Sequence, residues 1–306
     1  MKRILAITLC AIMLCALLAS CASQKEEKGD YPRIAVTSHV VADWTLNILE
    51  SAYEMFQIDL LADTGKDMHN FQPSAADMRI IATADLVIYI GGESDKWMES
   101  ALKNVGSQAK AVRLMDVVEE HEAEHHGDHD HGADEHIWLS FENAIRSVEM
   151  ITDAICALDA ERAEVFNRNK EEYTEKLNSL YAEYKTAAET AKFKTLVFAD
   201  RFPFVYLVEE LGLEYAAAFP GCSSETTASF ETVVSLARIV DEKQLPCVIV
   251  LENSEGIAKT VIENTASKNA QTLALDSMQI MSDGDFDYLA TMQKNLSTLK
   301  IALGVE

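Results

Sequence analysis

Residues 159–193 read DAERAEVFNRNKEEYTEKLNSLYAEYKTAAETAKF and contain neither glycine nor proline. Apolar side chains recur in this stretch mostly at steps of three and four residues, and charged or amide side chains occupy the other positions. The pattern predicts one amphipathic helix of about 50 Å, at ~1.5 Å per residue. A coiled coil is the alternative, but the apolar positions drift after about three heptads and lack strict a and d positions. The packing stripe comprises Phe166, Tyr173, Leu177, Leu180, Tyr184, Ala188 and Ala191.

The sequences on either side of this helix share one pattern, in which short apolar runs alternate with amphipathic stretches. Such alternation is typical of parallel sheets covered by helices. The predicted strands are 33–38, 57–63, 86–90, 111–116, 195–199, 213–218, 247–251 and 272–275. The predicted helices are 43–51, 74–83, 203–211, 230–243, 255–268 and 286–303. We therefore expect two doubly wound α/β lobes, 31–158 and 194–306, joined by the long rigid helix 159–193, with room for a core in each lobe.

The N-terminus has the layout of a secretory signal peptide over residues 1–20, in which Lys2 and Arg3 precede the apolar run 4–18. This run is too short for an ordinary membrane-spanning helix. Leu18-Ala19-Ser20-Cys21 resembles the bacterial lipobox, so we expect Cys21 to carry lipid; a plain secretory signal cut nearby is the alternative. Residues 21–30 then form a polar tether. These features predict a protein anchored to the extracytoplasmic face of the cell membrane.

The charge and the cysteine usage exclude several classes of partner and site. A formal net charge of −24 repels nucleic acid and anionic headgroups and attracts cations, so no nucleic-acid partner is expected. Beyond the signal and the lipid site only Cys156, Cys222 and Cys247 remain, and no C-x-x-C pair occurs. The sequence therefore predicts neither a disulfide framework nor a thiolate metal site.

Residues 119–133 are dense in histidine, acidic residues and glycine, and almost nothing apolar interrupts them. Such a segment cannot bury a core, so we expect a mobile loop. Imidazoles at this density favour zinc, copper and nickel over magnesium or calcium, which predicts an accessory metal loop. A merely solvated acidic loop is the alternative, and the match of His121–His125 to H-E-x-x-H is typical of zinc proteases only on a packed helix. The loop histidines are His121, His125, His126, His129 and His131.

Other histidines and acids follow predicted strands, where ligands of doubly wound sheets bind. His39 follows the first strand, His69 lies in the loop after the second, and His136 stands where order resumes after the histidine-rich loop. A lone histidine at a strand end is more often a structural residue than a ligand, but other candidate ligands elsewhere in the chain make a metal site more plausible here. Asp200, Glu252 and Asp276 end three strands of the second lobe, although each alone would suit a helix cap. Together they predict a metal site in the interlobe cleft.

These residues resemble the zinc and manganese receptors of bacterial ABC importers, the metal-binding cluster of substrate-binding proteins. The likeness covers nearly the whole mature chain. It rests on the lipobox, on Met68-His69-Asn70-Phe71-Gln72-Pro73 at a P-H-x-[FY]-x-P loop, on Ala84–Tyr89 before a Gly-Gly turn and Trp97, on His136-Ile137-Trp138-Leu139 after a histidine-rich loop, and on the long linking helix.

The resemblance implies that His69, His136 and Asp276 bind the metal. The family's third position, a His or Glu in an H-x-A-F-x-Y type motif, falls on Arg201, whose guanidinium has no lone pair for a metal. Asp200 is one residue away and is the predicted substitute. Otherwise three protein ligands and water complete the site, or Glu225 or Glu252 takes part.

The resemblance also implies capture and delivery of a metal ion without chemistry on a substrate. Two imidazoles and one or two carboxylates suit Zn²⁺, and also Mn²⁺ if water fills extra positions. The histidine-rich loop favours zinc. The expected partner is an ABC importer permease in the membrane, and the receptor is expected to be a monomer whose rigid helix permits only small lobe tilts. The other hypotheses are an extracellular zinc metalloenzyme and a surface adhesin.

Overall fold

The computed structural model describes residues 31–61, 65, 67–118, 134–220, 228–252, 254–280 and 286–305. Residues Pro32–Glu306 form one compact unit. The predicted signal peptide, Cys21, the five loop histidines, Cys222 and Glu225 lie outside the described residues. Within the described part of the chain, no helix is both long enough and apolar enough to cross a bilayer.

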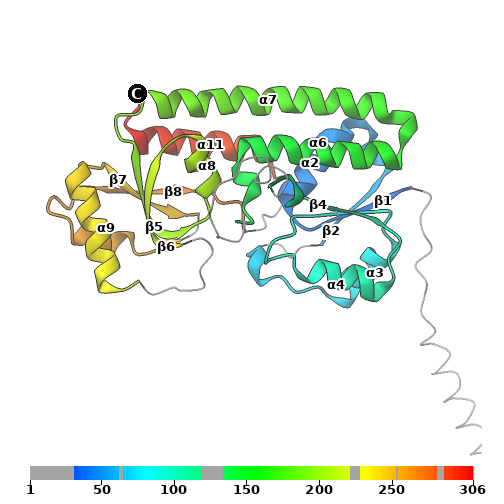
Figure 1. The fold of residues 1–306 in the computed structure, drawn as a ribbon, viewed down its shortest axis with the longest axis horizontal. Helices are drawn as coiled ribbons and strands as arrows, with labels where there is room; N and C mark the ends of the chain where they lie inside the picture. Colours follow the sequence, from blue (N-terminus) through cyan, green and yellow to red (C-terminus); the bar gives the residue numbers. More distant parts are fainter. Residues whose placement is uncertain are drawn as a thin grey trace, which may run out of the picture. The chain divides into compact units, whose positions relative to one another are not determined.

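The N-terminal sheet consists of four parallel strands in the order β2-β1-β3-β4. Its strands are β1 (Arg33–Val36), β2 (Gln57–Leu60), β3 (Leu86–Tyr89) and β4 (Lys110–Arg113). The helices between and after them are α2 (His39–Leu49), α3 (Ala75–Thr83), α4 (Trp97–Val105) and α6 (Phe141–Leu158), shown in Figure 1. Every residue of β3 is buried, as the uninterrupted apolar run predicts for a strand covered on both faces.

The C-terminal sheet repeats this topology, with parallel strands in the order β6-β5-β7-β8. Its strands are β5 (Thr195–Phe202), β6 (Glu214–Pro220), β7 (Cys247–Leu251) and β8 (Gln271–Leu275). Its helices are α8 (Val205–Glu210), α9 (Phe230–Lys243), α10 (Ala258–Glu263) and α11 (Tyr288–Leu303). The predicted fold, two doubly wound α/β lobes with a long helix between them, is confirmed.

The linking helix, α7, runs over Ala163–Glu189 after a 3₁₀ turn at Ala160–Arg162, so the continuous helix is shorter than the predicted range 159–193. It lies along α6 and α11 (Figure 1) and also packs on α2. The Asn169 side-chain amide donates to the carbonyl of Ile48 in α2, and the Tyr184 hydroxyl donates to the carbonyl of Met292 in α11. One helix therefore braces elements beside both sheets.

The main hydrophobic core is continuous from one sheet to the other, which differs from the expectation of a core in each lobe. It includes Ile34 of β1, Leu177 of α7 and Phe198 of β5, and smaller clusters cover the outer faces of the two sheets. The apolar stripe of α7 supplies the connection, because it faces α2, α6 and α11 at once. The domain boundaries at 158/159 and 193/194 stay a prediction.

His39 lies in a different environment from the expected strand-end loop, because it is the first residue of α2 and is buried. Its ring meets Phe286 edge-on, with ring centroids 4.1 Å apart. Burial lowers its pKa to about 4, so the imidazole is neutral at physiological pH. His39 packs as a structural residue.

The first turn of α6 is capped from the other half of the molecule by Glu210, the last residue of α8. The Glu210 carboxylate accepts hydrogen bonds from the Ser140 hydroxyl, from Phe141 N at 3.1 Å and from Glu142 N at 3.2 Å. Ser140 Oγ in turn accepts from Asn143 N at 2.9 Å. The donors of the first turn are thus satisfied by one carboxyl group and one hydroxyl. Burial raises the pKa of Glu210 to about 7, so this cap works chiefly through its hydrogen bonds rather than through its charge.

Asp43 of α2 is a carboxylate whose burial predicts a measurable pH dependence of stability. Tyr173 of α7 donates to it at 3.2 Å, and Asp287, the N-cap of α11, adds repulsion. Burial chiefly, and then Asp287, raise its pKa from 3.8 to about 7. The folded state then holds a proton that the unfolded state has lost between these values, so stability falls as pH rises from about 4 to about 7.

We expect Asp43→Asn to raise the free energy of unfolding by about 2 kcal/mol at pH 8 and to leave it nearly unchanged at pH 4, because asparagine carries no charge to desolvate. Urea unfolding at both pH values measures the difference. Glu54→Gln, which removes the same charge at an exposed position, is the control. An equal gain at both pH values would assign the effect to packing instead.

Candidate metal centre

His69 lies in the loop after β2, within the 3₁₀ turn Met68–Asn70. Asp67 caps this turn, because its Oδ1 accepts from His69 N at 3.0 Å. The same stretch is fastened to the far end of the chain: Asp67 forms an antiparallel bridge with Ile280, and Met68 N donates to Gln279 O at 3.0 Å. The backbone of the C-terminal half therefore positions His69.

His136 immediately precedes the 3₁₀ turn Ile137–Leu139, and its side chain is only 1% exposed. Two residues on, the Trp138 indole N–H donates to Ser277 O at 2.9 Å, and the Tyr288 hydroxyl donates to Trp138 O at 2.6 Å. His136 is thus fixed to the same segment that holds the His69 loop.

That segment, 277–280, directly follows Asp276 at the end of β8. Asp276 Oδ1 accepts from Met278 N at 2.8 Å, and the amide of Asn295 in α11 pairs with the Asp276 backbone. Met278 has φ of +56°, a conformation costly for a side chain with a Cβ and typical of functional sites. The segment that follows Asp276 thus contacts the backbone stretches that carry His69 and His136, from two distant parts of the sequence.

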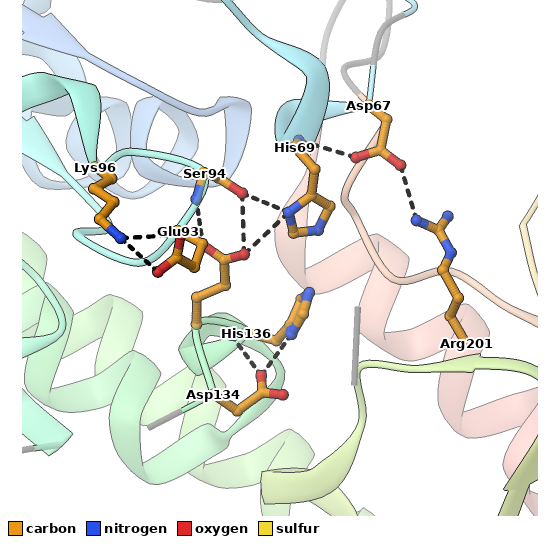
Figure 2. A network of polar contacts seen from close by, with 9 residues as sticks. Asp67, His69, Glu93, Ser94, Lys96, Asp134, His136 and Arg201 are labelled. Carbon is orange, nitrogen blue, oxygen red and sulfur yellow. Dashed lines mark hydrogen bonds and ion pairs between the residues drawn. The ribbon is translucent and has the colours of Figure 1, made fainter. Parts of the chain in front are cut away.

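The imidazoles of His69 and His136 face each other, with ring centroids 5.5 Å apart and an interplanar angle of 63°. His69 Nδ1 lies 2.6 Å from Ser94 Oγ and 3.0 Å from Glu135 Oε1, and His136 Nδ1 lies 2.5 Å from Asp134 Oδ1. Figure 2 shows the Nε2 edges of both rings turned toward each other. The predicted histidine pair is brought together.

Glu135 is buried beside His69, and its surroundings favour the ionised form. Ser94 N donates to Oε2 at 2.8 Å and Ser94 Oγ to Oε1 at 3.1 Å. Burial acts to raise the pKa of Glu135, but the hydrogen bonds from His69 and Ser94 N outweigh it and lower that pKa. For His69, burial acts to lower the pKa, but the Glu135 hydrogen bond and the charges of Glu135 and Asp67 raise it.

The predicted carboxylates occupy separate places in the C-terminal sheet. Asp200 Oδ1 accepts from Arg201 N at 2.8 Å and Oδ2 from Leu251 N at 3.3 Å, so both oxygens already serve backbone donors of β5 and β7. Glu252 accepts from Ser277 N and Oγ at 2.7 and 2.6 Å, and burial raises its pKa to about 7. Among the described residues, no three His, Cys, Asp or Glu side chains form a group arranged to hold a metal ion. Asp200 and Asp276 as ligands stay predictions.

Arg201 reaches from β5 to the His69 loop, where its Nη1 donates to Asp67 Oδ2 at 3.3 Å. Figure 2 shows the guanidinium beside Asp67, on the other side of His69 from Ser94. Its positive charge acts to lower the pKa of His69, so the guanidinium interacts electrostatically with the imidazole. Arg201 thus forms an ion pair with the residue that caps the His69 turn.

Sequence reasoning did not identify Asp67, Ser94, Asp134 or Glu135 as partners of the two histidines. The acidic pair 134–135 directly precedes His136, but it ends a run of similar acids, so its position alone did not single it out. Ser94 follows the Gly91-Gly92 turn, which was noted only as part of the family pattern.

The family model described as the periplasmic zinc-uptake complex component A, ZnuA, matches residues 34–302. The chain belongs to the ZnuA family. The match includes His69, His136, Asp200 and Asp276. The matched range also contains Arg201 and the linking helix α7.

Curated relatives and solved structures agree with membership of the ZnuA family. The zinc-binding lipoprotein AdcA of Streptococcus pneumoniae strain R6 is 30% identical over 311 residues, covering 96% of this chain and 60% of AdcA. The high-affinity zinc uptake system protein ZnuA of Bacillus subtilis strain 168 is 28% identical over 95% of each chain. The metal-dependent lipoprotein YcdH of Bacillus subtilis superposes with a TM-score of 0.74 at 25% identity, covering 89% of this chain and 99% of YcdH. The chain spans about 60% of the length of the streptococcal relative.

Proposed function

We propose that this chain is a receptor that binds zinc outside the cytoplasm and delivers it to the permease of an ABC importer. The observation that carries the proposal is the facing pair of imidazoles, His69 and His136, each with Nδ1 against a carboxylate. Metal-binding histidines have this outer arrangement in most zinc sites. The role is capture and release, without chemistry on a substrate.

The proposed protein ligands are His69, His136 and Asp276. Two imidazoles and a carboxylate suit tetrahedral Zn²⁺, with water or a further donor in the fourth position. Asp200 is the further donor that the sequence predicts. The names of the Streptococcus pneumoniae and Bacillus subtilis relatives favour zinc. Manganese is the alternative for the same donors, since carboxylate and water suit it as well.

Location and partners follow from the same proposal. The resemblance of residues 18–21 to a lipobox supports a lipid on Cys21, and the pneumococcal relative is named a lipoprotein, which supports anchoring at the extracytoplasmic face. The permease is the partner in the membrane, and the receptor acts as a monomer. The histidines of 119–133 would gather zinc near the site as an accessory loop.

Metal competition on the full chain tests the proposal. The chain is titrated with zinc against a chelator of known affinity, and the titration is repeated with manganese in excess. We expect one zinc equivalent to bind tightly and to resist manganese, and weaker equivalents to be lost when residues 119–133 are deleted. If tight binding disappears with the loop, the chain is better described as a histidine-rich metal buffer. If the chain prefers manganese, the transported ion is manganese and not zinc.

The charge of Arg201 predicts a gain of affinity on its removal. The Arg201 charge acts on the His69 imidazole, so it would also repel a divalent ion bound there. This repulsion is worth about 1–2 kcal/mol after screening, so Arg201→Met is expected to tighten zinc binding about tenfold, and less at high salt. Arg238→Met, which removes an exposed arginine of α9 paired with Glu242, is the control. Unchanged or weaker binding would mean that the Arg201–Asp67 pair is needed to hold the His69 loop.

A further inference from the structure

We propose that Asp134 and Glu135 are positioning residues, each accepting the Nδ1 proton of one imidazole so that both Nε2 atoms are presented to the same ion. The inference deepens the proposed zinc function and rests on it. Two consecutive residues of one backbone stretch would set the tautomers of two histidines that lie 67 residues apart in sequence, as their numbers show.

The contacts of Glu135 assign the proton on His69. An ionised carboxylate can only accept hydrogen bonds, and Glu135 Oε1 lies 3.0 Å from His69 Nδ1. Ser94 N and Ser94 Oγ both donate to this carboxylate, so it cannot turn away without losing them. A bare Nδ1 would bring its lone pair against an anion. Ser94 Oγ lies closer still, 2.6 Å from the same Nδ1, but its hydrogen goes to Glu135, so it too can only accept from Nδ1. The Nδ1–H tautomer is therefore preferred, and Nε2 keeps the lone pair.

Asp134 acts in the same way on His136. Its Oδ1 lies 2.5 Å from His136 Nδ1 and also accepts from His136 N at 2.8 Å, so one oxygen holds both the ring and the backbone of the same residue. The Tyr206 hydroxyl donates to the Asp134 carbonyl at 2.8 Å, which fixes the stretch against the C-terminal half. The buried ring has little freedom to flip.

Gly92 makes the approach of Glu135 possible. A Cβ added at Gly92 would lie 2.2 Å from Glu135 Cβ and 2.3 Å from Oε2. Contacts of this length do not occur, so any side chain at position 92 must displace Glu135. The glycine turn after β3 is thus part of the support of His69.

The consequence is preorganisation of the donor pair. A histidine in the wrong tautomer must exchange a proton through solvent before it can bind through Nε2, and outer carboxylates also strengthen the imidazole as a ligand. Loss of such a partner typically costs about 10- to 100-fold in metal affinity.

Nitrogen-15 NMR of the imidazoles in the metal-free full chain tests the tautomers directly, at a pH where both rings are neutral. We expect His69 and His136 both to be protonated on Nδ1. Glu135→Leu should move His69 toward the Nε2–H form, leave His136 unchanged, and weaken zinc binding about 10- to 100-fold. Glu135→Gln should restore the tautomer and part of the affinity, since its amide oxygen can accept from Nδ1.

Two more variants separate this role from general stability. Gly92→Ala should reproduce the Glu135→Leu spectrum and affinity loss, although it alters no polar group. Glu93→Gln, which changes an exposed neighbour bonded to Lys96, should alter neither. An Nε2–H tautomer at either histidine of the unchanged protein, or full zinc affinity in Glu135→Leu, overturns the inference. Failure of the unchanged protein to bind zinc would refute the proposed function instead, while the tautomers would still be read in its absence.

Discussion

Zinc affinity is expected to fall by about 1000-fold when His136 is replaced by alanine. Zinc bound by about four ligands in a small protein site contributes ~10–16 kcal/mol, so one ligand accounts for about 3–4 kcal/mol, or roughly 100- to 1000-fold. The upper value applies here because His136 is 1% exposed and is fixed by Asp134 before the ion arrives. The substitution therefore removes a donor that pays little further entropy to become fixed when the ion binds.

Chelator competition on His136→Ala measures the loss of zinc affinity, and the bound zinc per chain gives the stoichiometry. Asp276→Ala and Asp200→Asn are measured in the same series to test the two predicted carboxylate ligands. His39→Gln is the control, because it changes a buried imidazole outside the proposed ligand set. His39→Gln should unfold more easily than the unchanged protein and still bind zinc. If His136→Ala keeps one tight equivalent, the paired imidazoles are not the site.

Glu210→Leu is expected to lower the free energy of unfolding by about 3 kcal/mol. The substitution leaves the Ser140 hydroxyl, Phe141 N and Glu142 N without their shared acceptor at a partly buried helix start. Each donor left without a partner costs about 1–3 kcal/mol where it is buried, and solvent can reach the most exposed one.

Thermal or urea unfolding of Glu210→Leu gives the value, and two variants control for it. Glu210→Gln keeps an acceptor oxygen and should lose only about 1 kcal/mol. Glu209→Leu places the same side chain on the exposed neighbouring position of α8 and should be close to neutral. Equal losses for Glu209→Leu and Glu210→Leu would show that α8 itself, rather than the cap on α6, is sensitive.

Local patterns predicted the architecture because both sheets are parallel and covered. A strand buried on both faces must be apolar throughout, so runs such as Cys247–Leu251 are visible in the sequence and are strands in the structure. Helices α4 and α6 were not predicted, although Ser140 and the apolar spacing after it are ordinary signs of a helix start. The continuous core across α7 could not be read locally, because it depends on which helices meet.

The candidate site shows the same division between local and distant information. His69 and His136 could be found from their places after strands and after the histidine-rich loop. Their partners Asp134 and Glu135 could not, because a carboxylate next to a histidine in sequence can point anywhere until the backbone is fixed. Asp200 was predicted as a ligand because it stands next to Arg201 in the sequence. Its contacts with the backbone amides of Leu251 and Arg201 could not be predicted, because they depend on the pairing of β5 with β7.

The segment 277–280 gives the protein an order of assembly. The Trp138–Ser277 hydrogen bond joins residues 139 apart, and the Asp67–Ile280 bridge spans still more of the chain. Contacts this remote form late in folding, because long loops must close first. A chain that ends before β8 would contain both imidazoles but would lack segment 277–280, which aligns them. The alignment of the two imidazoles is therefore acquired only when the last 36 residues, from the start of β8 onward, have been added.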